Sequence, residues 1–279
     1  MVAIRYSECP CLPALLERYP RNPSYALIRT PETEYLRKID FAGPSLDHCC
    51  GDGAFTRMVC PNGFDAGVDF SLDVLNSARL VRKSNGNGSL YGELRQSDVS
   101  KSLPWPEATF NLVLNNSGLE HVNGLEGALR EVSRVLRPGG RFVFTLFAKR
   151  ALEWWPGDLE EGSRNLYVKR QPMFNLLSLE EWIRLLMDQG MRIVDFESHF
   201  DREENEFNIR YDYAHSMYYL AKRPLPPKLA FLHKRPRLSR WYFGRMLRKR
   251  TYCSYPNEDA GASYCITAVK LPANAGQSF

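Results

Sequence analysis

Two glycines and a carboxylate near residue 50 have the types and spacing of a nucleotide-binding site. A short apolar segment, Leu46-Asp47, leads into the turn Cys50–Gly53, and a helical stretch then leads to a second apolar segment, 66–68, that ends at Asp69. Glycines in such a turn let the backbone approach a ligand closely, and the carboxylate can hold both hydroxyls of a ribose. The pattern therefore predicts a site for an adenosyl ligand.

The length of the turn distinguishes between adenosyl ligands. Dinucleotide-binding folds carry the spacing GxGxxG, and their pyrophosphate sits on the amides at the start of the helix. The turn here is shorter, and Asp52 would repel a pyrophosphate. We therefore expect a ligand without one.

Four downstream segments extend the pattern: VDFSLDVLNSAR, QSDVSKSLPW, FNLVLNNSGLEHV and LREVSRVLRPGGRFVFT. With the turn, they resemble the S-adenosylmethionine-dependent methyltransferases of class I, in particular the type 11 subgroup, over roughly residues 25 to 200. The resemblance implies S-adenosylmethionine as cofactor. It also implies an α/β fold, in which helices flank a seven-stranded Rossmann-like sheet and an insertion precedes the last strand.

The resemblance and the strand ends together give a set of expected cofactor-binding residues: Arg29, Asp47, Cys49, Gly51, Gly53, Asp69, Phe70, Asp98, Val99, Asn115 and Asn116. Asp69 would hold the ribose, and Asp98 would accept from the adenine amino group, because a carboxylate only accepts. The Val99 amide would meet a ring nitrogen of the adenine.

Three residues of this set are expected at the methionine end of the cofactor. Asn115 and Asn116, which follow a buried strand, would receive the ammonium, and Arg29 would meet the carboxylate. Plainer roles stay open for two members of the set: Asp98 as a helix N-cap and Arg29 as a structural or solvated arginine.

Cys49 departs from the family pattern D-x-G-x-G-x-G, because it occupies the place of the first glycine, with His48 before it. Its Cβ narrows the approach of the backbone to a ligand. Affinity for the methionine end of the cofactor is therefore expected to be altered.

His121 is the expected catalytic residue. Methyl transfer from a sulfonium is an in-line displacement, so the protein acts mainly by aligning the acceptor and excluding water. A hydroxyl acceptor must also lose its proton, and His121 follows the strand end nearest the expected donor methyl. The alternative is a histidine that only orients the substrate or caps a helix.

Periodicity predicts the elements that position these residues. Apolar runs predict strands over 110–114, 141–147, 191–196 and 264–270, and apolar stripes predict helices over 25–39 and 125–136. The capping-box sequence Ser178–Glu181 predicts a helix over 179–189. Residues 1–24 are expected to be irregular, and 151–175 a loop over the active site.

Length and composition favour a single domain over 1–279, with an N-terminal cap, 1–40, and an insertion, 201–262. The sequence has neither a membrane-length apolar run nor a signal pattern, so we expect a cytoplasmic protein. The seven cysteines are expected to be reduced. The pair Cys9-Pro10-Cys11 has no second pair at ligand spacing, so no metal is expected.

The segment Lys222–Arg250 holds eleven basic and no acidic residues, and the remainder of the chain has 26 basic and 32 acidic residues. Aromatic and aliphatic side chains alternate with these charges, and four prolines (224, 226, 227 and 236) interrupt any long helix. The segment is expected to form a lid that meets an anionic substrate or membrane surface, which leaves peripheral membrane association open. A solvated cover without a partner is the alternative.

The expected function is methyl transfer from S-adenosylmethionine to a small-molecule, sugar or lipid-linked acceptor, with an oxygen as the favoured nucleophile. A nucleic-acid methyltransferase would account for the basic segment. However, enzymes that methylate base amino groups usually end this strand in Asn/Asp-Pro-Pro-aromatic, whereas here it ends in NNSG. A non-catalytic S-adenosylmethionine-binding adaptor at a membrane is the other alternative.

Overall fold

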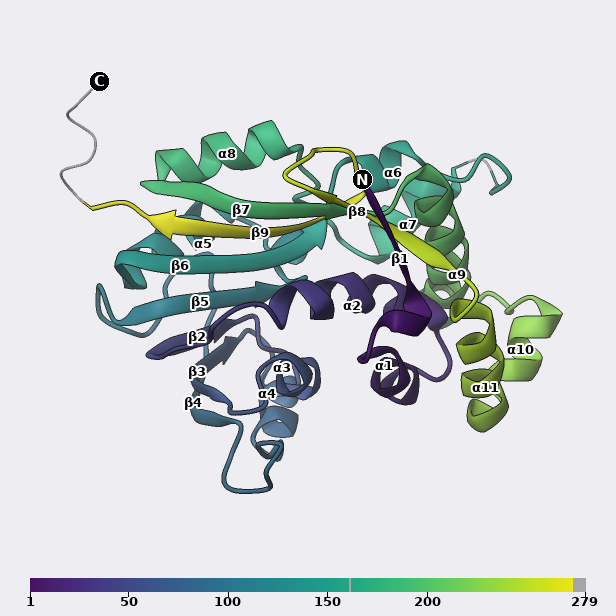
Figure 1. The fold of residues 1–279 in the computed structure, drawn as a ribbon, viewed down its shortest axis with the longest axis horizontal. Coiled ribbons are helices and arrows are strands. Elements are labelled where there is room, and N and C mark those ends of the chain that lie inside the picture. Colours follow the sequence, from purple (N-terminus) through teal and green to yellow (C-terminus); the bar gives the residue numbers. More distant parts are fainter. Residues whose placement is uncertain (161, 273–279) are drawn as a thin grey trace. The chain divides into compact units, whose positions relative to one another are not determined.

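A computed structural model describes residues 1–160 and 162–272 (Figure 1). The chain divides into two compact units. The first unit contains Met1–Tyr35, Ala148–Met173 and Glu197–Ser263, and the second contains Leu36–Phe147, Phe174–Phe196 and the chain from Tyr264. The expected cap and insertion fall largely in the first unit, together with 148–173.

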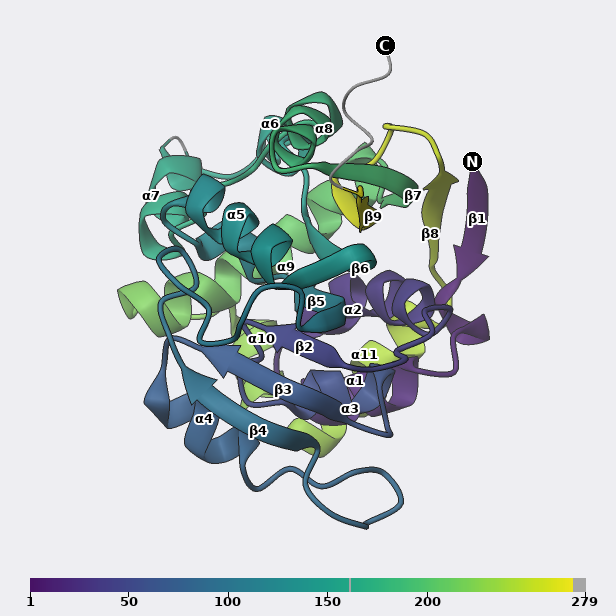
Figure 2. The same cartoon turned by 90° about the vertical axis from the view of Figure 1, so that its left-hand side faces the viewer.

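The second unit is built on a sheet whose central strands are parallel. Its strands are β2 (Ser45–His48), β3 (Phe64–Asp69), β4 (Tyr91–Gln96), β5 (Phe110–Asn116), β6 (Leu136–Phe147), β9 (Ser263–Lys270) and most of β7 (Met191–His199). Figure 2 shows the succession from β4 through β3, β2 and β5 to β6, in which neighbours pair in parallel. The carboxyl ends of these strands therefore meet at one edge.

The predicted number of seven strands is wrong, because nine strands join among the residues described, in the order β1-β8-β7-β9-β6-β5-β2-β3-β4. The two additional strands are β1 (Val2–Arg5) and β8 (Thr251–Pro256), which pair antiparallel. β8 also pairs antiparallel with the last residues of β7. Such pairing between distant parts of the chain leaves no local pattern in the sequence.

The helices of the second unit are α3 (Ala54–Val59), α4 (Leu72–Ala78), η2 (Leu119–His121), α5 (Leu125–Val135) and α8 (Leu179–Asp188). α5 and α8 form where the apolar stripe over 125–136 and the capping box at Ser178 predicted helices. α5 contacts β6 and α8, and it buries Leu129, Val132 and Val135. The capping box that starts α8 is confirmed, because the Ser178 side chain accepts from the Glu181 amide.

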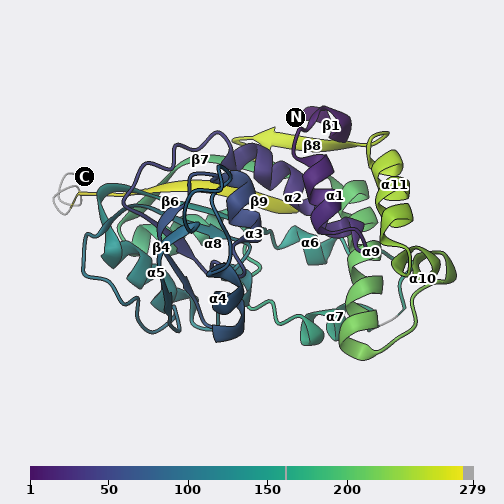
Figure 3. The same cartoon turned by 90° about the horizontal axis from the view of Figure 1, so that it is seen from below.

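The first unit is more helical than the sequence indicated. Its helices are η1 (Tyr6–Glu8), α1 (Leu12–Arg18), α2 (Pro23–Leu36), α6 (Arg150–Glu153), α7 (Ser163–Arg170), α9 (Arg202–Ala221), α10 (Pro227–His233) and α11 (Pro236–Leu247). The expectations of an irregular 1–24 and a loop over 151–175 are therefore wrong. The prolines do divide the basic segment as predicted, since Pro227 and Pro236 start α10 and α11 (Figure 3).

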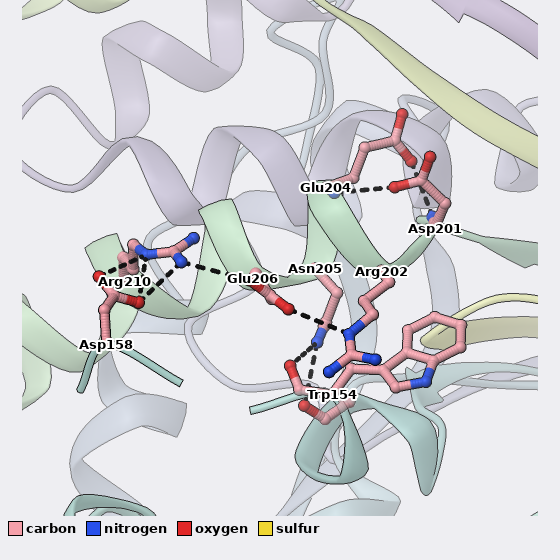
Figure 4. Close-up of polar contacts among 9 residues, drawn as sticks. Trp154, Asp158, Asp201, Arg202, Glu204, Asn205, Glu206 and Arg210 are labelled. Carbon is pink, nitrogen blue, oxygen red and sulfur yellow. Dashed lines mark hydrogen bonds and ion pairs between the residues drawn. The ribbon is translucent and has the colours of Figure 1, made fainter. Parts of the chain in front are cut away.

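Polar contacts fasten α9 to the segment that contains α6 (Figure 4). The Asn205 amide donates to the carbonyls of Ala151 and Trp154, at 3.0 and 3.2 Å. Arg210 donates to both carboxylate oxygens of Asp158. Sequence patterns gave no sign of these contacts, which explain why α6 and its neighbours form ordered structure against α9.

Among the described residues, no helix combines the length and the apolar character needed to cross a membrane.

Candidate functional site

The turn after β2 brings its backbone to the carboxylate at the end of β3. Gly51 and Gly53 have φ values of 55° and 72°, in the left-handed region that favours glycine. The Gly51 amide donates to Asp69 Oδ2 at 3.0 Å. A Cβ at Gly51 would meet no atom within 4 Å. The backbone at Gly51 is therefore accessible to a ligand.

Asp69 is held in place from both sides of its carboxylate. Its Oδ1 accepts from the Ser71 amide at 2.9 Å, while Oδ2 carries the bond from Gly51. The next side chain, Phe70, is 73% exposed, and its carbonyl accepts from the Gln96 amide group. The end of β3 thus presents a fixed carboxylate beside an exposed aromatic ring.

Asp47 lies below the turn rather than at the surface. It is 2% exposed, and its Oδ2 accepts from Thr56 Oγ1 and from the Tyr91 hydroxyl, both at 2.7 Å. Burial raises the pKa of Asp47 to about 6. Thr56 and Tyr91, which sequence patterns did not single out, therefore support the turn together with Asp47. The predicted contact of Asp47 with a cofactor stays a prediction.

We expect Asp47→Asn to raise the free energy of unfolding at pH 7 by about 1–3 kcal/mol. The pKa of Asp47 is about 6 in the folded protein and 3.8 ordinarily. The buried charge therefore does not lower the free energy of unfolding below pH 3.8, and it lowers that free energy by the full amount above about pH 6. The Asn oxygen still accepts from Thr56 and Tyr91. Urea unfolding at pH 4 and pH 7 measures the difference, with exposed Asp73→Asn as control. Destabilisation at pH 7 would contradict the account.

Cys49 adopts the backbone conformation of the glycine that it replaces. Its φ is 60°, and its Sγ lies 3.6 Å from Nδ1 of His48. His48 is fully buried, and burial lowers its pKa to about 4, so the ring is neutral at pH 7. The chain accepts a strained cysteine here, which is consistent with strong local constraints on the turn.

Asn115 connects this turn to the loop after β5. Its Nδ2 lies 2.8 Å from Nδ1 of His48 and donates to the His48 carbonyl at 3.0 Å. Its Oδ1 accepts from the amides of Gly118 and Leu119, both at 3.1 Å. The side chain of Asn115 is therefore engaged in fixing the loop, and its predicted contact with the methionine ammonium stays a prediction.

Gly118 is required beside Cys49. A Cβ on Gly118 would lie 2.7 Å from the Cys49 Cβ and 3.0 Å from Asn115 Nδ2. We expect Gly118→Ala to lower the free energy of unfolding by about 1–3 kcal/mol, as overpacking does. Cys49→Gly removes the nearest clash, so the double variant should recover part of that loss in a double-mutant cycle. Additive effects in urea unfolding would contradict this coupling.

Asp98 and Val99 follow β4, as predicted. Asp98 Oδ1 accepts from the amide and hydroxyl of Ser100, at 3.1 and 2.6 Å, and Oδ2 forms an ion pair with Lys101 at 3.0 Å. The Ser100 hydroxyl, followed by Lys101, lowers the pKa of Asp98. The carboxylate thus organises its own turn, and contact with an adenine stays a prediction.

His121 ends the short helix η2 and is exposed. The preceding residue, Glu120, is 2% exposed, and its carbonyl accepts from the Phe174 amide at 2.7 Å. Asn175 donates to the carbonyls of Leu119 and Val122, both at 2.7 Å. Glu120 and Asn175, which sequence patterns did not single out, therefore fix the segment that presents His121.

Asn116 and Arg29 are the remaining predicted residues. Asn116 donates to Thr145 Oγ1 at 2.6 Å, at the end of β5. Arg29 belongs to the first unit, where it forms an ion pair with Glu32 at 2.7 Å. The part of the set that the structure brings together is thus the turn, Asp69, Phe70 and the loop after β5.

Comparisons with known proteins agree with this geometry. The family described as a methyltransferase domain matches residues 46–144. A malonyl-[acyl-carrier protein] O-methyltransferase of Enterobacter lignolyticus is 28% identical over 57% of this chain and 59% of that protein. A demethylmenaquinone methyltransferase of Leptospira interrogans is 32% identical over 43% of this chain and 51% of that protein. The chain thus spans between 51% and 59% of these relatives.

A solved structure extends the likeness over most of the fold. A methyltransferase of Thermotoga maritima, described as a possible histamine N-methyltransferase, has a TM-score of 0.54 and 14% identity, and the match covers 94% of this chain and 99% of that one. At this identity the likeness concerns the fold alone. Residues 46–144 therefore match a methyltransferase-domain family, and the fold of the chain is similar to that of a solved methyltransferase.

Proposed function

We propose that the chain binds S-adenosylmethionine at the carboxyl ends of β2, β3 and β5 and transfers its methyl group to a small-molecule acceptor. The observation that carries the proposal is the pairing of the accessible Gly51 backbone with the fixed Asp69 carboxylate. In open α/β sheets, ligands bind at this edge. An adenosyl group fits these residues, because the carboxylate accepts from ribose hydroxyls and the exposed Phe70 ring offers a flat surface.

Asp98 suits the adenine end of this ligand. Its oxygens already accept from Ser100 and Lys101, but an ionised carboxylate offers about four lone-pair sites. One lone-pair site is therefore left to accept a hydrogen bond from the adenine amino group. We assign Asp98 and the Val99 amide to the adenine, and Asn116 to the methionine end, on the strength of their places at the ends of β4 and β5.

The bound donor supplies a methyl group on an activated sulfonium. The protein's own contribution is to hold the acceptor oxygen in line with that methyl and to accept the proton that the oxygen loses. His121 is the group we assign to the proton, because it is exposed directly after the β5 loop and fixed through its neighbours Glu120 and Asn175. The methyl moves from sulfur to oxygen, and the proton moves to the imidazole.

The names of two relatives support the class of acceptor. One is named an O-methyltransferase acting on malonyl-[acyl-carrier protein], and another a demethylmenaquinone methyltransferase. Both names support a metabolic acceptor rather than a nucleic acid. Oxygen stays our favoured nucleophile, since an exposed histidine base is useful for a hydroxyl.

A methyl-transfer assay with isotopically labelled donor tests this function. The protein is incubated with panels of hydroxyl, carboxyl and quinol compounds, and labelled products are identified by mass spectrometry. Label on an acceptor oxygen would support the proposal in full. Label on carbon would correct the nucleophile, and donor binding without any transfer across the panels would favour the non-catalytic adaptor.

A further inference from the structure

A groove with a cationic rim lies between α1 and α11, both in the first unit. Its volume is about 640 Å³. Pro13 and Leu16 of α1 and Gly244 of α11 line it. A Cβ on Gly244 would lie 3.3 Å from Leu16 Cδ1, so the glycine lets the two helices pack closely at the base of the groove.

The other lining residues are mostly basic. Five cationic side chains line the groove, all of them exposed: Arg237, Arg240, Arg245, Arg248 and Lys249. The only acidic residue in the lining described is Glu17, which lies 3.6 Å from Arg240 in an exposed ion pair. Such a pair contributes little. The groove therefore carries a clear excess of positive charge.

Helix stability does not explain this placement. Cations favour the carboxyl end of a helix, which accounts for Arg245 and Arg248, but Arg237 and Arg240 lie near the amino end, where a cation is unfavourable. The first turn of α11 contains no acidic residue. Arg237 and Arg240 are like charges at helical neighbour spacing in α11, which lowers helix stability. An anion bound in the groove would offset the repulsion between these cations.

We propose that this groove binds a ligand that carries two or more phosphate groups or an equivalent cluster of phosphates. Arginine recognises phosphate oxygens through its planar fork of donors, and four arginines together offer enough donors for more than one phosphate group. Trp241, which lines the groove and is 61% exposed, offers a surface for an apolar or aromatic part of the ligand. The groove and the proposed methyl-transfer site share no residue, so this proposal does not depend on that function.

Calorimetric titration of the full chain tests the site with inorganic pyrophosphate, and co-sedimentation tests it with phosphatidylcholine vesicles that contain phosphatidic acid. Arg237→Gln/Arg240→Gln should weaken binding by about tenfold or more, because two charged hydrogen-bond donors are removed. Binding should also fall as salt rises from low to physiological concentration. Pyrophosphate binding identifies a free phosphate ligand, whereas binding to the vesicles alone identifies a lipid headgroup.

Arg184→Gln/Arg192→Gln is the matched control, since both arginines are exposed in the second unit and the net charge changes equally. Circular dichroism checks that each variant is folded. A change in tryptophan fluorescence on ligand binding that is lost in Trp241→Phe places the ligand in the groove. The proposal is overturned if neither probe binds at low salt, or if the control weakens binding as much as the groove variant.

Discussion

His121→Ala is expected to lower kcat on an oxygen acceptor by about 10²–10⁴-fold, the usual contribution of a general base. Affinity for S-adenosylmethionine should stay nearly unchanged, because His121 lies beyond the strand end that we assign to the cofactor. Steady-state kinetics with a labelled donor measure the first effect, and calorimetry measures the second.

His233→Ala is the control for this experiment, since it removes a histidine from the first unit. It should leave both kcat and donor affinity close to those of the unchanged protein. Wild-type turnover by His121→Ala at neutral pH would assign this residue a structural role. Equal losses in both histidine variants would indicate a general effect on folding instead of base catalysis.

Asp69→Ala is expected to weaken S-adenosylmethionine binding by about 1–3 kcal/mol, which is roughly 5- to 150-fold in Kd. We assign the carboxylate to the two ribose hydroxyls, and it also accepts from the Gly51 amide at 3.0 Å. Calorimetric titration measures the loss. Asp69→Asn, which keeps an acceptor for Gly51 but removes the charge, should give a smaller loss.

The exposed acid Asp73, in the first turn of α4, provides the matched control. Asp73→Ala changes the net charge equally, so unchanged donor affinity there isolates the effect at Asp69. Urea unfolding shows whether loss of the Gly51 bond has destabilised the turn. Unchanged affinity in Asp69→Ala would remove this residue from the cofactor site.

Local sequence patterns predicted the structure correctly where the residues that determine it lie close together in the sequence. The turn at Gly51–Gly53, the carboxylate at the end of β3 and the capping box at Ser178 are all set by neighbours within one βαβ unit or one helical turn. Their sequence signals and their structures agree because the same few residues carry both.

Patterns failed where distant segments determine the structure. β1 pairs with β8 from the other end of the chain, and its four residues carry no periodicity long enough to indicate a strand. α6 and α7 form in a Trp- and Gly-rich stretch, where contacts from α9 such as that of Asn205 supply the stabilisation. Tertiary packing of this kind overrides local propensity.

The direction of a side chain was the least predictable part of the site. Asp47 turns inward to Tyr91, which is 44 residues away, and Asn115 turns to His48, which is 67 residues away. Both belong to the predicted set by position, but their observed partners lie within the protein. Register among β2, β3, β4 and β5 decides these partners, and no single segment contains that information.

Titration of the unchanged protein by calorimetry with S-adenosylmethionine, its demethylated product S-adenosylhomocysteine, and NAD tests the central claim most directly. All three carry an adenosine, but only NAD carries a pyrophosphate, which Asp52 in the turn would repel. We predict binding of the first two ligands with one site per chain and much weaker binding of NAD. Tighter binding of NAD than of S-adenosylmethionine would contradict the assignment of this site.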